Sequence, residues 1–162
     1  MKKDAPSSNL VDLLNQALAR ELQVSVQYML QHAVGTSQGL PSSMASSTEK
    51  QNKFIASHSM YFLPGATLKK IAITEMRHAE AISERIVNLG GVPTTQPAKI
   101  TLDMTAKAML ENDREQESGA IELYRSIIAS TDNEKDEITA RLFKSILKDE
   151  ENHHQLFTNL LA

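Results

Sequence analysis

The stretch "ITEMRHAEAI", residues 73–82, decides how the chain folds. Apolar side chains recur in it and around it every three to four residues, which is the spacing of a helix that buries one face. Two of the inward positions carry Glu75 and His78 instead. Residues three apart lie on the same face of a helix, so both side chains can reach a single point.

A second Glu-x-x-His pair lies near the other end of the sequence. It is part of "LKDEENHHQL", residues 147–156, and consists of Glu150 and His153. One such pair is a weak signal, because any helical protein carries several by chance. Two pairs on two apolar helical stripes indicate a duplicated helical hairpin whose halves contribute to one site.

The composition excludes several classes of function. The chain has 162 residues with 41% hydrophobic and 23% charged residues, which is typical of one soluble globular domain. The formal net charge of -3 and the lack of a basic tail make DNA binding unlikely. Cysteine is absent, so a metal must be held by nitrogen and oxygen ligands. No apolar run is long enough for a membrane span, and a cytoplasmic location follows by default.

The periodicity predicts an all-α fold, a four-helix bundle made of two antiparallel helical hairpins. A single domain, residues 1–162, is expected to contain it. A Ser- and Gly-rich insertion over 35–65, with room for a short helix, separates the first two helices. The expected helices cover about 8–34, 66–89, 103–130 and 134–161, with Thr131 or Asp132 capping the last.

The other two helices each carry an inward glutamate followed by a tyrosine seven residues on: Glu21 with Tyr28, and Glu117 with Tyr124. Burying four unpaired carboxylates costs several kcal/mol per ion, and two divalent cations would balance their charge. Iron or manganese suits such a carboxylate-rich site with one imidazole per metal, and zinc can also enter. The predicted ligands are Glu21, Glu75, His78, Glu117, Glu150 and His153.

A plainer reading of these residues stays open. An inward glutamate can pair with an arginine, and Tyr28 and Tyr124 can be core residues whose hydroxyl groups are satisfied. A hydrogen bond from each tyrosine to a ligand carboxylate is the alternative. His154 follows His153 but turns about 100° away, so it is expected at the surface or in an interface. His32 could be an outer ligand, although a packed or solvent-facing histidine is the commoner case.

Three segments of the sequence resemble the bacterioferritin branch of the ferritin-like superfamily. They are "ELQVSVQYMLQHA", "ITEMRHAEAISERIVNLGGVP" and "ILKDEENHHQL". The resemblance implies that the six predicted ligands form a di-iron ferroxidase centre. It also implies that Glu75 and Glu150 bridge the metals and that Tyr28 supports a ligand. Met76 matches the methionine through which bacterioferritins bind haem b between two subunits, although methionine here is also common in relatives without haem.

Two departures from bacterioferritin bear on assembly. The chain ends soon after His153, so a short fifth helix after the bundle is not expected. The 35–65 insertion is similar in place to the extra helix of Dps-like mini-ferritins. A homo-oligomeric shell of 12 subunits is therefore favoured over one of 24 subunits or a dimer.

The resemblance implies that the protein oxidises Fe(II) with O2 or H2O2, for iron storage, detoxification and protection against oxidative stress. The alternative is a rubrerythrin-like di-iron peroxidase that stores no iron. Such a protein would need an outside electron donor, because the chain has no cysteine for a rubredoxin domain. A di-metal oxygenase acting on an organic substrate is a further class, but a compact bundle leaves little room for a substrate pocket.

Overall fold

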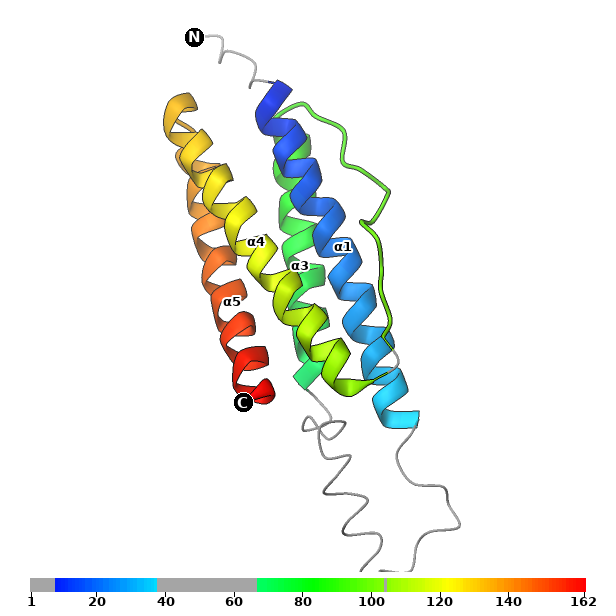
Figure 1. Cartoon of the computed structure of the whole chain (residues 1–162). Coiled ribbons are helices and arrows are strands. Elements are labelled where there is room, and N and C mark those ends of the chain that lie inside the picture. The colour runs from blue at the N-terminus through cyan, green and yellow to red at the C-terminus, as the bar shows by residue number, and fades with distance from the viewer. Residues whose placement is uncertain (1–7, 38–66, 104) are drawn as a thin grey trace, which may run out of the picture.

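The computed structural model describes residues 8–37, 67–103 and 105–162. The regular structure in these ranges is entirely α-helical, and the four helices form one bundle (Figure 1). The predicted fold class is confirmed, whereas most of the 35–65 insertion lies outside the described residues. None of the described helices is long and apolar enough to cross a membrane. The helices are α1 (Ser8–Ser37), α3 (Thr67–Asn88), α4 (Ala106–Glu134) and α5 (Glu137–Leu161).

The helices pack as two antiparallel hairpins, α1 with α3 and α4 with α5 (Figure 1). The connection between the hairpins runs back along α1 for most of its length. It is fastened there by hydrogen bonds, from Thr94 N to Asn15 Oδ1 at 2.7 Å and from Ala98 N to the Ala19 carbonyl at 2.7 Å. This long crossover makes α3 and α4 run in the same direction, and it brings α4 against α1.

The helix ends follow from local chemistry. After α3, Gly90 adopts a φ of 79°, and a side chain on Gly91 would lie 2.7 Å from Val11. The prediction that Thr131 or Asp132 caps the last helix is wrong, because both lie inside α4. The cap is Asp136, whose carboxylate accepts from Thr139 N at 3.1 Å and pairs with an Arg85 nitrogen at 2.6 Å.

The apolar core is divided into two clusters along the bundle. One contains Leu14, Ile82 and Phe143, and the other contains Val24 and Phe157, among other residues. On each helix, the residues between the two clusters include the glutamates that the sequence marks as ligands. The fold therefore places one polar layer at mid-length, closed above and below by apolar packing.

A second buried polar feature lies where α1 meets α4. The amide nitrogens of Gln27 and Gln31 both donate to Asp113 Oδ1, at 3.0 and 2.8 Å. Asp113 is fully buried, and its Oδ2 has no hydrogen-bond partner among the described residues; neither does Gln31 Oε1. Burial raises the pKa of Asp113 to about 7, against the opposing effect of the two amide donors. Protonation would supply a donor where two acceptors now lack one.

Asp113→Asn should stabilise the protein at alkaline pH. Folding raises the pKa of the Asp113 carboxyl, so the protonated carboxyl stabilises the folded state. This stabilisation is complete at pH values below the pKa of the unfolded chain, and it is lost as the pH rises through about 7. The neutral amide removes the penalty and adds a donor. We expect the gain in unfolding free energy to be on the order of 2–4 kcal/mol at pH 8 and smaller at pH 5.

Thermal unfolding of the variant and wild type at both pH values measures this effect. Glu115→Gln on the exposed side of α4 makes the same charge change and should show no pH-dependent gain. An equal gain at pH 5 and pH 8 would contradict the assignment to Asp113 ionisation.

Candidate metal centre

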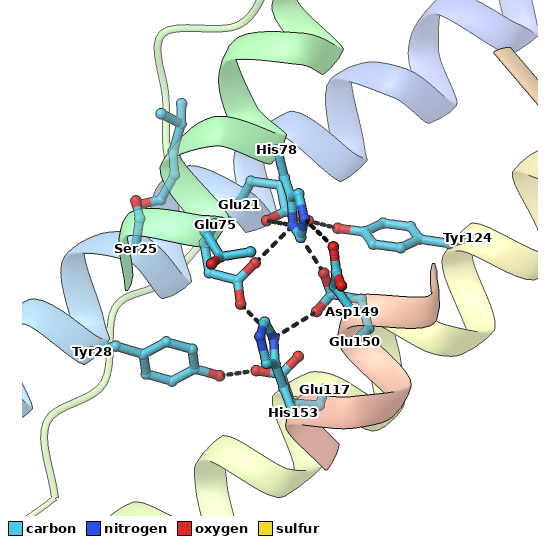
Figure 2. Close-up of polar contacts among 12 residues, drawn as sticks. Glu21, Ser25, Tyr28, Glu75, His78, Glu117, Tyr124, Asp149, Glu150 and His153 are labelled. Atoms are coloured by element: carbon cyan, nitrogen blue, oxygen red, sulfur yellow. Dashed lines mark hydrogen bonds and ion pairs between the residues drawn. The ribbon is translucent and has the colours of Figure 1, made fainter. Parts of the chain in front are cut away.

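Six side chains from all four helices meet in the polar layer at mid-length (Figure 2). The structure brings together every residue that the sequence predicts as a ligand. The four glutamates are at most 1% exposed, and the two histidines are close to fully buried. The contributors are Glu21 of α1, Glu75 and His78 of α3, Glu117 of α4, and Glu150 and His153 of α5.

The six residues form two overlapping groups. In each group, one nitrogen or oxygen atom per residue lies within 4.8 Å of all the others. Glu75 and Glu150 belong to both groups. Glu21 and His78 complete the first group, and Glu117 and His153 complete the second. The arrangement is that of two neighbouring cation positions with two shared carboxylates.

The shared carboxylates direct one oxygen to each half. Glu75 Oε2 lies 2.9 Å from His78 Nδ1, while its Oε1 lies 2.8 Å from His153 Nδ1. Glu150 Oε1 lies 3.1 Å from His78 Nδ1, while its Oε2 lies 3.9 Å from His153 Nδ1. Both histidines therefore present Nδ1 to the carboxylates, and each of the two glutamates has one oxygen near either histidine.

Several atoms of the cluster are buried without a hydrogen bond among the described residues, which is the exception in folded proteins. His153 Nδ1 is one of them, although it lies only 2.8 Å from a carboxylate oxygen. Short distances without hydrogen-bond geometry suit atoms that share a cation. The set comprises Glu21 Oε2, Glu75 Oε1, Glu117 Oε2, Glu150 Oε1 and His153 Nδ1.

Two tyrosines hold the outer carboxylates in place. The Tyr28 hydroxyl of α1 donates to Glu117 Oε1 on α4, and the Tyr124 hydroxyl of α4 donates to Glu21 Oε1 on α1. In each case the hydrogen bond occupies one carboxylate oxygen and leaves the other, Oε2, without a hydrogen bond among the described residues. The sequence left two roles open for these tyrosines, a plain core residue or a hydrogen-bond donor to a carboxylate. Both tyrosines are donors to a carboxylate.

Without a cation, protons balance the charge of the cluster. Burial, together with the nearby Glu150 carboxylate, raises the pKa of Glu21 and of Glu117 well above its usual range. Burial alone would lower the pKa of His153, but the adjacent carboxylates of Glu150 and Glu75 outweigh it and raise the pKa to about 9. Burial would raise the pKa of Glu150, but the two histidines beside it hold that pKa below its ordinary value.

The remaining candidate residues lie outside the cluster. His154 is half-buried, and Met76 is 57% exposed. Sequence reasoning missed Asp149, whose Oδ2 lies 3.3 Å from His78 Nε2. The helical period turns Asp149 away from the inward stripe, so its position next to Glu150 in the sequence was the only available signal.

Comparison with known proteins agrees with this geometry. Residues 65–162 match the Ferritin family model, described as a ferritin-like domain. The chain belongs to the ferritin family. It is 33% identical to the bacterioferritin of Desulfovibrio desulfuricans over 154 residues, which are 94% of this chain and 74% of that protein. It is 30% identical to the bacterioferritin of Mycolicibacterium paratuberculosis over 142 residues, 87% of this chain and 76% of that protein.

A solved structure of the Desulfovibrio desulfuricans bacterioferritin is similar in fold to this ferritin-family chain. The TM-score is 0.73 at 32% identity, covering 95% of this chain and 78% of that one. That structure is described as showing a diiron site in different catalytic states. This similarity confirms the four-helix fold and the bacterioferritin branch that the sequence motifs indicate.

Divalent cation binding should release protons from the cluster of this ferritin-family chain. At pH 7 the raised pKa of about 9 keeps His153 protonated, and a cation must displace that proton. Affinity for Zn(II) is therefore expected to increase from pH 6 to pH 8. Calorimetric titration in two buffers of different ionisation enthalpy measures the released protons.

The His154→Ala variant is the control, since His154 adjoins His153 in sequence but lies outside the cluster. It should bind and release protons as the wild type does. Zinc binding with no proton release at pH 7 would contradict the proposed charge balance.

Proposed function

We propose that the protein is a di-iron ferroxidase of the bacterioferritin type, which oxidises Fe(II) with O2 or H2O2. One observation carries the proposal: Glu75 and Glu150 each direct one oxygen toward one half of the six-residue cluster and the second oxygen toward the other half. Bridging carboxylates hold two metals about 3.5–4 Å apart, close enough to react with one oxidant molecule. The diiron site in the solved structure of the Desulfovibrio desulfuricans bacterioferritin supports the same assignment.

The donor set favours iron. Four carboxylates and two imidazoles offer hard oxygen and borderline nitrogen donors, which suit Fe or Mn, while Zn can also enter. Two divalent cations would offset the charge of four buried carboxylates without the protons that now do so. In the proposed reaction, iron is both the metal of the site and the substrate.

The residues of the chain supply geometry and charge. A pair of Fe(II) ions contributes two electrons, enough to reduce H2O2 to water or O2 to peroxide. Glu75 and Glu150 would bridge the ions, and Tyr28 and Tyr124 keep the outer carboxylates turned toward their positions. The two apolar clusters above and below exclude bulk water.

Glu75→Ala should abolish rapid iron oxidation, because it removes one bridge from both metal positions. Stopped-flow absorbance after mixing Fe(II) with aerobic protein measures the rate. We expect a loss of more than about 100-fold, since losing even an outer partner of a ligand costs about 10- to 100-fold. Glu80→Ala, on the exposed side of the same helix, should keep the wild-type rate. Unchanged kinetics in Glu75→Ala would refute the proposal.

We further propose that the protein assembles into a homo-oligomeric shell that stores the oxidised iron. The large apolar side chains exposed on the adjacent helices α1 and α3 include five that self-association would cover. They are Val26, Met29, Leu30, Ile73 and Met76. We predict a shell of 12 subunits in preference to one of 24 subunits. A cytoplasmic location also stays a prediction.

Light scattering after size-exclusion chromatography, with iron measured on the same peak, tests storage. An iron-bearing particle of 12 or 24 subunits is expected. A dimer with about two metals per chain would favour the rubrerythrin-like peroxidase instead.

Haem b at Met76 also stays a prediction. The Met76 side chain is 57% exposed on α3, and a thioether sulfur can serve as an axial haem ligand. Binding there would require a second subunit to cover the other haem face. A Soret band that appears on reconstitution with haem and is lost in Met76→Leu would support haem binding, and its absence would favour a methionine that packs at an interface.

A further inference from the structure

We propose that Asp149 is a positioning residue that orients His78 and makes the two metal positions unequal in affinity. The inference rests on the proposed metal site and goes beyond its six ligands. Asp149 Oδ2 contacts Nε2 of His78, the ring nitrogen opposite the one that faces the carboxylates (Figure 2).

The His78 ring is contacted at both nitrogens. Its Nδ1 faces the cluster, 2.9 Å from Glu75 and 3.1 Å from Glu150, and its Nε2 lies 3.3 Å from Asp149 Oδ2. A neutral imidazole that binds a metal through Nδ1 carries its proton on Nε2, which must donate. Asp149 is placed to accept that hydrogen bond, fixing both the tautomer and the ring orientation.

The other half of the centre lacks this support. Asp149 directly precedes Glu150 on α5 and reaches the histidine of α3. The residue at the matching place on α3 is Thr74, directly before Glu75. Its hydroxyl donates to the Lys70 carbonyl of its own helix, at 3.2 Å. Among the described residues, no contact corresponding to that of Asp149 is made to His153.

Two consequences distinguish positioning from a simple surface charge. The Asp149 side chain is 46% exposed, so removing its charge alone should have a small effect at moderate salt. Asn at this position keeps an acceptor oxygen, whereas Ala removes it. If Asp149 works by its hydrogen bond, Asp149→Asn should retain most of the affinity that Asp149→Ala loses.

Calorimetric titration of the intact protein with Co(II) tests the inference. Wild type should take up two equivalents per chain. In Asp149→Ala, one equivalent should weaken by about 10- to 100-fold, as expected for an outer partner of a histidine ligand. The loss in Asp149→Asn should be several-fold smaller. Glu151→Ala, an equal charge loss at a residue paired with Arg125, should match wild type.

A double-mutant cycle assigns the effect to His78. In a His78→Ala background, adding Asp149→Ala should change cobalt affinity by no more than about twofold, because the positioned ring is gone. Equal weakening of both equivalents, identical losses in the Asn and Ala variants, or full additivity in the cycle would each overturn the inference. Wild type that binds no cobalt would instead overturn the metal centre itself, so the two failures are distinguishable.

Discussion

The structure depends on four carboxylates buried at the middle of an apolar bundle. Glu21, Glu75, Glu117 and Glu150 are each at most 1% exposed. Four like charges in that environment are strongly unfavourable unless protons or cations accompany them. The rest of the molecule is arranged around this constraint, with two apolar clusters that close the layer on both sides and helices long enough to carry it at mid-length.

The site compensates for its charge in a way that suits exchange between protons and metal. Both histidines present Nδ1 toward the shared glutamates, and the raised pKa values keep protons in the cluster. Tyr28 and Tyr124 engage one oxygen of each outer carboxylate and leave the other available. Pairing each tyrosine with the opposite helix also ties α1 to α4. The same hydrogen bonds thus contribute to fold and site together.

Much of this could be read from the sequence, because the helical period fixes which residues share a face. The Glu-x-x-His spacing placed Glu75 with His78, and with the inward glutamates of the other two helices it gave all six residues that the structure brings together. Contacts set by helix packing could not be read in this way. Asp149 lies off the inward stripe of its own helix, and Asp113 meets the glutamines of α1 only through the crossover. The Asp136 cap is local, since its carboxylate accepts from Thr139 N, but the prediction ended the preceding helix too early and so chose an earlier cap.

Anomalous X-ray diffraction from crystals loaded anaerobically with Fe(II) tests the central claim most directly. Two iron peaks per chain are predicted, about 3.5–4 Å apart, between Glu75 and Glu150 and each beside one histidine Nδ1. A single peak, or iron bound only at surface carboxylates with the cluster still protonated, would contradict the account.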